Sequence, residues 1–324
     1  MSEQDTGEEH PGPLFAIGGA EDKLKKRSVL RQFIAAAGGD EARVVVVPTA
    51  SALGPEVVDV YAAVFGALGA KEVTAVRPET RVEADDPATV ATLDRATGIF
   101  MTGGNQLKLS AVVAGTAFGE AIRASNARGV AVGGTSAGAS ILAEHMIAFG
   151  RPGSTPRQRM GQLAAGLGLI PQAIVDQHFA QRNRYGRLLS LVAQSPALLG
   201  IGIDEDTAAI IEGDRLRVAG RSVVTIIDGS RTVSNAHSAQ RSAPLLVSGV
   251  QLHVLPEGAV FDLATRALVS TGVEPHADEV AELQAANQDL RELAARIAAE
   301  GVSPTYYAER RRRASKRRAD GPTS

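Results

Sequence analysis

Cysteine is absent from the 324 residues of the chain. That absence excludes disulfide bonds, metal sites built on thiolates and a cysteine nucleophile. Any covalent catalysis must therefore use an oxygen or an amine. The sequence also lacks a run of eighteen consecutive apolar residues, and its first thirty residues contain no apolar stretch of signal-peptide length. We therefore expect a soluble, cytoplasmic protein without a membrane partner.

The chain also lacks a large net charge, because its 34 Lys and Arg residues nearly balance its 36 Asp and Glu residues. The nine residues from Arg310 to Arg318 nevertheless carry seven of the positive charges, which leaves the rest of the chain with a formal charge of −9. A mildly acidic body is a poor general binder of polyanions, so we do not expect a nucleic-acid partner. The hydrophobic fraction of 44% is enough for the core of one large α/β domain or two small ones.

Short apolar runs alternate with longer helical patterns through the first two-thirds of the chain. This rhythm predicts βα units that feed a mostly parallel, buried sheet in a doubly wound α/β fold. The expected strands and helices are Leu14–Ile17, Arg43–Val47, Glu72–Val76, Gly98–Met101 and Gly129–Gly133, and Ser28–Ala37 and Pro55–Leu68.

After about Leu199 the pattern changes to short strands with tight turns, which predicts a β-meander that extends the same sheet. Its expected strands are Leu199–Ile203, Ala208–Ile211, Arg215–Val218, Ser222–Ile227 and Leu252–Leu255.

The chain is expected to divide into four parts. Residues 1–13 are predicted to be a flexible N-terminus, 14–270 a catalytic domain, 271–305 a helical extension and 306–324 an arginine-rich tail. Within the extension, residues Ala277 to Glu300 have apolar side chains at seven-residue spacing. This pattern fits either an amphipathic helix that lies on the body or a coiled coil that binds a partner. The tail fits either a solvated end or a contact with a charged polymer.

The strongest local motif is Gly134-Thr135-Ser136-Ala137-Gly138, which follows one expected strand and precedes a stretch, Ala139–His145, that can form a helix. A G-x-S-x-G sequence between a strand and a helix is typical of a nucleophile elbow, in which the serine hydroxyl projects from the carboxyl edge of the sheet. Ser136 is the predicted nucleophile, and the N–H of Ala137 could face a developing oxyanion. The alternative is a glycine-rich turn that only packs a helix on a sheet.

A second glycine pair, Gly103-Gly104, also follows an expected strand and is followed by Gln106. Loops after parallel strands meet at the carboxyl edge of the sheet, where ligands usually bind. The N–H of Gly103 or Gly104 could therefore complete an oxyanion hole, and Gln106 could orient a substrate. A plain helix-entry turn would have a similar sequence.

Among six histidines, His178 is the candidate general base, because it ends an apolar strand that delivers Asp176, Gln177 and His178 at its carboxyl end. A carboxylate that orients the imidazole is expected from Asp204-Glu205-Asp206, which follows another strand. If the strand continues through these residues, side chains alternate between its two faces, so Glu205 lies on the face opposite Asp204 and Asp206. The sequence alone does not choose among the three acids.

Three arginines, Arg182, Arg184 and Arg187, follow the candidate base closely. Guanidinium groups at these positions could hold substrate carboxylates through paired hydrogen bonds. Alternatively, they could form a solvated helix face. The loop from Gly150 to Gly161 is a candidate cover for the same pocket.

These residues, in this order, resemble the cyanophycinase family, serine peptidases of the peptidase E-like S51 group. The resemblance spans about Leu14 to Leu263 and rests on five motifs in register. They are Ile17-Gly18-Gly19-Ala20-Glu21-Asp22-Lys23, Thr102-Gly103-Gly104-Asn105-Gln106, Gly133 to Ala139, Asp176-Gln177-His178-Phe179 with the three arginines and Leu188, and Gly202 to Ala208.

The resemblance implies hydrolysis of cyanophycin, a storage polymer with a poly-aspartate backbone and an arginine on each β-carboxyl group, to β-Asp-Arg dipeptides. It implies Ser136 as nucleophile, His178 as general base and Glu205 as the third member. It also implies a three-layer α/β sandwich related to class I glutamine amidotransferases and a homodimer. We expect no metal or redox cofactor, because Ser136, His178 and two backbone donors suffice for acyl transfer. The positions that the resemblance places in the substrate pocket are Gln106, Asp176, Gln177, Arg182, Arg184 and Arg187.

Two other functions fit parts of the sequence. One is a related peptidase that acts on small aspartyl or isoaspartyl dipeptides. The other is a non-catalytic protein that keeps the fold and binds a partner or nucleic acid through its tail. The order Ser, His, Glu differs from the Ser, acid, His order of α/β-hydrolases, which argues against an esterase.

Overall fold

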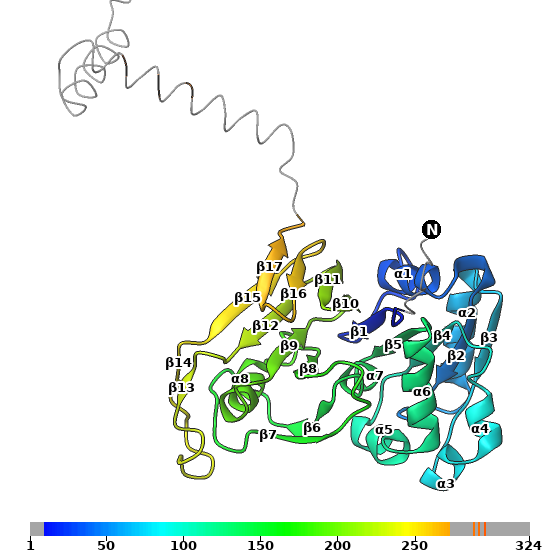
Figure 1. Cartoon of the computed structure of the whole chain (residues 1–324), viewed down its shortest axis with the longest axis horizontal. Coiled ribbons are helices and arrows are strands. Elements are labelled where there is room, and N and C mark those ends of the chain that lie inside the picture. Colours follow the sequence, from blue (N-terminus) through cyan, green and yellow to red (C-terminus); the bar gives the residue numbers. More distant parts are fainter. Residues whose placement is uncertain (1–9, 273–287, 289–290, 292–294, 296–324) are drawn as a thin grey trace, which may run out of the picture. The chain divides into compact units, whose positions relative to one another are not determined.

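The computed structural model describes residues 10–272 of the chain, together with residues 288, 291 and 295 (Figure 1). The expected helix Ala277–Glu300 and the arginine-rich tail lie outside these residues. Gly12, within the N-terminal segment expected to be flexible, donates its N–H to the carbonyl oxygen of Asn126 at 2.8 Å and accepts the Asn126 side-chain amide at 2.7 Å. No helix in the described part of the chain is long and apolar enough to cross a membrane.

The central element is a nine-stranded sheet with the order β17-β16-β11-β10-β1-β5-β4-β2-β3. The five strands from β1 to β3 in this order are mutually parallel, and the other four join by antiparallel pairing. The bounds are β1 (Leu14–Ile17), β2 (Arg43–Val47), β3 (Glu72–Ala75), β4 (Gly98–Met101), β5 (Ala131–Thr135), β10 (Thr207–Glu212), β11 (Arg215–Gly220), β16 (Val260–Asp262) and β17 (Ala267–Ser270).

Helices cover both faces of this sheet, as expected for an α/β sandwich. On one face α1 and α2 bury an aromatic cluster in which the Phe33 ring centroid lies 5.5 Å from that of Phe15 and 5.2 Å from that of Phe100. On the other face α5 and α6 bury Leu109 and Phe118. The bounds are α1 (Ser28–Ala36), η1 (Gly39–Glu41), α2 (Glu56–Ala67), α3 (Arg81–Ala84), α4 (Pro87–Ala91), α5 (Gln106–Val113), α6 (Ala117–Ala127), α7 (Ala137–Ser140) and α8 (Tyr185–Gln194).

A second, four-stranded sheet has the order β15-β12-β9-β8, where β8 and β9 are parallel. The meander therefore does not extend one sheet as expected. Its strands β10 and β11 join the large sheet, whereas β9, β12 and β15 form the smaller one, and the chain crosses between them at Asp204–Asp206. The bounds are β8 (Ala173–Gln177), β9 (Leu199–Ile203), β12 (Val224–Asp228) and β15 (Gln251–Leu255), and two short ribbons pair β6 (His145–Gly150) with β7 (Gly161–Ala165) and β13 (Val233–Ser234) with β14 (Val247–Ser248).

Two sequence predictions near the elbow need correction. The strand expected over Gly129–Gly133 runs instead over Ala131–Thr135, because Gly129 has a φ of 92° and ends helix α6 in a left-handed conformation. The helix expected over Ala139–His145 ends at Ser140. His145 is the first residue of β6, which pairs with β7 rather than continuing the helix.

Candidate active site

Ser136 lies at a sharp turn between β5 and α7. Its φ of 53° is unusual for a residue with a side chain, and such strain is typical of a nucleophile held at a strand-to-helix turn. The turn requires glycine on both sides: a Cβ atom on Gly134 would lie 2.2 Å from the carbonyl oxygen of Gly138. The G-x-S-x-G spacing thus allows β5 and α7 to approach closely while the serine side chain projects from the sheet edge.

The side chains of Ser136, His178 and Glu205 form a hydrogen-bonded chain. The Oγ atom of Ser136 lies 3.0 Å from Nε2 of His178, and Nδ1 of His178 lies 2.6 Å from Oε1 of Glu205. An ionised Glu205 can only accept, so Nδ1 carries the proton and Nε2 is left to accept from the serine hydroxyl. This arrangement suits proton transfer from Ser136 to His178.

The two neighbouring acids are engaged elsewhere. Asp204 is buried and accepts hydrogen bonds from the Ala180 N–H at 3.0 Å and the Ser222 hydroxyl at 2.7 Å. Asp206 accepts the Asp22 N–H at 2.8 Å. Of the three acids left open by the sequence, the structure brings Glu205 to the imidazole.

The electrostatic surroundings favour a neutral imidazole at His178. Burial lowers the pKa of His178, and the positive charge of Arg182 lowers it further, whereas the hydrogen bond to Glu205 raises it. Burial is the largest contribution, so the pKa lies below the usual range for histidine. A neutral His178 can accept a proton near pH 7, as a general base must.

Three backbone N–H groups near Ser136 are candidates for an oxyanion hole. A Cβ atom on Gly103 would lie 3.3 Å from the Cβ of Ser136, so this glycine is directly beside the serine. Ala137 begins α7, and the first N–H groups of a helix have no intrahelical acceptor. Within residues 10–272 the N–H groups of Gly103, Gly104 and Ala137 donate to no protein acceptor. They remain available to an anionic oxygen.

Two glutamines lie next to the serine. The Ser136 hydroxyl is 3.5 Å from Oε1 of Gln177, and the Gln177 side-chain amide donates to Oε1 of Gln106 at 3.0 Å. Gln106 in turn donates to the carbonyl oxygen of Ile147 on β6. These hydrogen bonds therefore join the start of α5, β8 and β6 beside Ser136.

The Asp176 carboxylate is buried and paired within the protein. Arg187 donates from Nε to Asp176 Oδ2 at 2.9 Å and also bonds to Oδ1, and Arg184 donates to Oδ1 at 3.1 Å. Burial lowers the pKa of Arg184 to about 10, which still leaves it protonated at pH 7. Arg184 and Arg187 thus hold an internal carboxylate, whereas Arg182 is exposed and has no side-chain partner among the described residues.

Sequence reasoning did not assign a role to a buried cluster behind the elbow. Glu21 accepts hydrogen bonds from the Tyr61 hydroxyl and the Thr135 hydroxyl, both at 2.6 Å, and pairs with Lys23 at 2.8 Å. Thr135 immediately precedes Ser136, so the cluster fixes the strand end to α2. Glu21 follows β1 within the first resemblance motif, and its position after a buried strand was the available signal.

A cavity of about 340 Å³ opens onto Ser136 and His178. Thr102, Gly103 and all four members of the Glu21 cluster also line it, namely Glu21, Lys23, Tyr61 and Thr135. Among residues 10–272, no group of three or more His, Asp and Glu side chains is arranged to hold a metal ion.

The contact between Gly19 and His178 gives a testable prediction. Gly19 has a φ of 100°, and a Cβ atom there would lie 2.3 Å from Cε1 of the imidazole. Gly19→Ala should therefore displace His178 and slow the reaction of Ser136 with a fluorophosphonate reagent about 100-fold, since small misplacements of reacting groups cost about that much. The labelling rate, followed by mass spectrometry, measures this effect.

Gly69→Ala is the matched control for Gly19→Ala. Gly69 has nearly the same φ, 98°, but a Cβ atom there would have no neighbour within 4 Å. The backbone strain is therefore shared, whereas the contact with the imidazole is not. Equal labelling rates for the two variants would contradict the predicted displacement.

Comparison with known proteins places this geometry in a family. The model of peptidase family S51 matches residues 14–219. A cyanophycinase from Geminocystis herdmanii is 40% identical over 255 residues, which cover 78% of this chain and 94% of the relative. A cyanophycinase from Nostoc is 42% identical over 260 residues, covering 79% and 87%. The crystal structure of a peptidase from an acI-B1 actinobacterium shares the fold, with a TM-score of 0.55 and 22% identity over 79% of this chain and 98% of that one. The chain belongs to peptidase family S51.

Proposed function

We propose that the chain is a serine-type exopeptidase that hydrolyses cyanophycin, multi-L-arginyl-poly-L-aspartate, to β-Asp-Arg dipeptides. This proposal rests on one observation: the His178 imidazole forms a hydrogen bond with the Ser136 hydroxyl through one nitrogen and with the Glu205 carboxylate through the other. The substrate class is supported by the relatives named cyanophycinase, at 40% and 42% identity over most of their length.

In the first half of the reaction Ser136 Oγ attacks the carbonyl carbon of the scissile peptide bond. His178 Nε2 takes the hydroxyl proton, and Glu205 stabilises the imidazolium that forms. The carbonyl oxygen becomes an oxyanion, for which the N–H groups of Ala137 and Gly103 or Gly104 are the proposed donors. The intermediate collapses when the C–N bond breaks and His178 returns its proton to the leaving amine, which leaves an ester on Ser136.

In the second half water attacks this acyl-enzyme. His178 takes a proton from the water, the same N–H groups hold the new oxyanion, and the C–O bond to Ser136 breaks as the serine regains its proton. A carboxylic acid is released and the enzyme returns to its starting state. Every proton passes through His178, so the cycle balances without an external reductant, oxidant or cofactor.

The remaining pocket residues receive separate proposed roles. Gln106 and Gln177 position the substrate beside Ser136, supported by their hydrogen bond and by the 3.5 Å approach of Gln177 to the serine. Arg182 is the arginine available to a substrate carboxylate. Arg184 and Arg187 support the pocket through Asp176, because all three are buried and both guanidinium groups donate to the Asp176 carboxylate.

Product analysis tests the function directly. Purified full-length protein is incubated with insoluble cyanophycin and, in parallel, with α-aspartyl and isoaspartyl dipeptides, and the products are identified by mass spectrometry. We expect β-Asp-Arg from the polymer. Hydrolysis of the dipeptides without release from the polymer would favour the small-dipeptide peptidase, and no hydrolysis in either arm would contradict the proposal.

We also propose that residues 14–270 form the catalytic domain, and that the protein acts as a cytoplasmic homodimer. The domain is supported by the compact unit that ends at Gly272, and the location by a substrate that cells store internally. Leu252 and Val254 support the dimer, because on the edge strand β15 they are 56% and 52% exposed. Sedimentation of the full chain should give about twice 33.6 kDa, and a monomer mass would contradict the dimer.

A further inference from the structure

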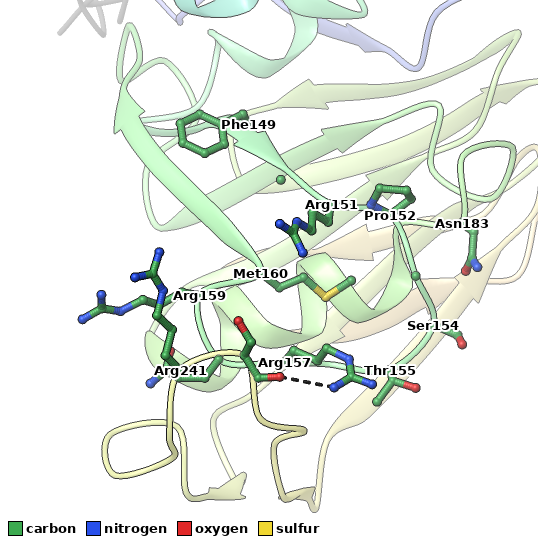
Figure 2. A pocket seen from close by; sticks show the side chains of 14 residues that line it. Phe149, Arg151, Pro152, Ser154, Thr155, Arg157, Arg159, Met160, Asn183 and Arg241 are labelled. Atoms are coloured by element: carbon green, nitrogen blue, oxygen red, sulfur yellow. Dashed lines mark hydrogen bonds between the residues drawn. The ribbon is translucent and has the colours of Figure 1, made fainter.

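A second cavity, of about 760 Å³, lies where the connection between β6 and β7 meets the start of α8 (Figure 2). Residues 149–155 and 157–160 form most of its wall, together with Asn183, Arg241 and Ser242. None of these residues lines the cavity at Ser136. The proposed chemistry at Ser136 does not use this second cavity.

The lining of the second cavity is strongly basic. It contains Arg151, Arg157, Arg159 and Arg241 and no acidic residue. The Arg157 guanidinium donates to the carbonyl oxygen of Ser242 at 3.2 Å, as Figure 2 shows, whereas the other three have no side-chain partner in the described part of the chain. All four side chains are exposed. Four guanidinium groups without a counter-charge create a positive potential that attracts carboxylates.

The wall of the second cavity is held by backbone hydrogen bonds between distant segments. The Gln158 N–H donates to the Ala243 carbonyl oxygen at 2.9 Å, and the Leu245 N–H donates to Pro156 at 2.9 Å. The arginines before and after position 158 are therefore fixed to the segment that carries Arg241. When the backbone that carries the charged side chains is already fixed, ligand binding costs less conformational entropy than it does at a flexible loop.

The second cavity adjoins the machinery around Ser136. The Arg187 guanidinium donates to the carbonyl oxygen of Gly150, which lines the cavity, at 3.1 Å, and it also holds Asp176, the residue before Gln177. Asn183, which lines the cavity as well, accepts the N–H of Gly153. The second cavity and the site at Ser136 therefore share the end of β8 and the start of α8.

We infer that the second cavity binds the carboxylates of a cyanophycin segment while another part of the same chain is cleaved at Ser136. This inference rests on the proposed function. In the polymer each arginine is attached through its α-amino nitrogen, so every unit keeps a free α-carboxylate beside its guanidinium. Protein guanidinium groups attract the first and repel the second, which fixes the direction in which each unit can enter.

Two kinds of substrate should respond differently to this site. A polymer can occupy both cavities, which raises its effective concentration at Ser136, whereas a fragment of two β-Asp-Arg units is too short for this gain. Arg159→Gln/Arg241→Gln removes two guanidinium groups that have no internal partner. We expect its KM for the polymer to rise about tenfold, with kcat unchanged and with kcat/KM for the two-unit fragment within about twofold of wild type.

The control is Arg31→Gln/Arg95→Gln, which removes the same charge from exposed arginines that line neither cavity and have no side-chain partner within residues 10–272. Binding is measured separately by sedimentation with insoluble cyanophycin, with Ser136→Ala present in every protein so that the polymer is not consumed. The Arg159/Arg241 variant should bind about tenfold more weakly than the control. Short poly-aspartate should compete with the polymer for the protein whose second cavity is intact and not for the Arg159/Arg241 variant.

Several results would overturn the inference. Equal polymer binding by the two double variants would show that the second cavity does not bind the substrate. An equal loss of kcat/KM for the polymer and for the fragment would show that the substitutions act on the active site. Competition by inorganic phosphate or duplex DNA, but not by poly-aspartate, would show that the cavity binds phosphate groups rather than the carboxylates of the polymer. If wild-type protein releases no β-Asp-Arg, the proposed function itself fails, and this result is read before any variant is compared.

Discussion

Ser136→Ala should reduce the release of β-Asp-Arg by at least about 10⁴-fold, because removal of a serine nucleophile from a cooperating triad costs on this order or more. The change deletes only Oγ, which lies 3.0 Å from His178 Nε2. The backbone N–H groups beside the serine remain. We therefore expect unchanged polymer sedimentation and a melting temperature near that of wild type, so that the loss appears in kcat rather than in binding.

Ser140→Ala is the matched control for the nucleophile. Ser140 ends α7, the short helix that follows Ser136, is buried, and its hydroxyl has no hydrogen-bond partner among the described residues. The substitution is chemically identical but removes no contact with His178. Release of β-Asp-Arg by Ser136→Ala at more than about a tenth of the Ser140→Ala rate would exclude Ser136 as the nucleophile.

The parallel half of the large sheet could be read from the sequence with little error. The predicted bounds Leu14–Ile17, Arg43–Val47 and Gly98–Met101 match the observed strands. These strands are buried on both faces, so each appears as a continuous apolar run bounded by polar or glycine residues. Local composition is sufficient when burial is complete on both sides.

The distribution of later strands between two sheets could not be read in the same way. A tight polar turn between apolar runs, such as Asp204–Asp206, looks the same whether the strands pair with each other or with different sheets. The decision depends on packing against distant elements: on β9, a Cβ atom on Gly202 would lie 2.5 Å from the Phe179 ring. Nothing local to the turn indicates that contact.

The active site shows the same limit. Sequence position brought out Ser136 and His178, because each directly follows a buried strand, β5 in the large sheet and β8 in the smaller one. It could not reveal that Asp176 is paired with Arg184 and Arg187, since that pairing depends on how α8 turns back over β8. It also could not bring Arg241 to the β6–β7 connection, because backbone pairing between segments far apart in the sequence forms that cavity.

Glu205→Gln should lower kcat by about 10² to 10⁴-fold with little change in KM. An amide cannot stabilise the imidazolium as a carboxylate does, and it can hold the imidazole in the wrong tautomer. The Glu205 side chain is 36% exposed, and solvent screening favours a loss towards the lower end of that range. Asp206→Asn is the control, because the Asp206 carboxylate accepts a backbone N–H rather than contacting His178, and an amide oxygen can still accept that bond.

The pH profile of Glu205→Gln separates an electrostatic role from a merely structural one. His178 must be neutral to take the serine proton, so activity falls as the pH drops through its pKa. Glu205 raises that pKa and Arg182 lowers it. The acid limb of kcat/KM should therefore move to lower pH in Glu205→Gln and to higher pH in Arg182→Gln, while a simple loss of folded protein would scale the whole profile without moving it. A carboxylate 2.6 Å from Nδ1 must alter the free energy of protonating the imidazole. Two results would therefore contradict the role of Glu205. One is an acid limb that does not move in either variant, and the other is a kcat for Glu205→Gln within about threefold of that for Asp206→Asn.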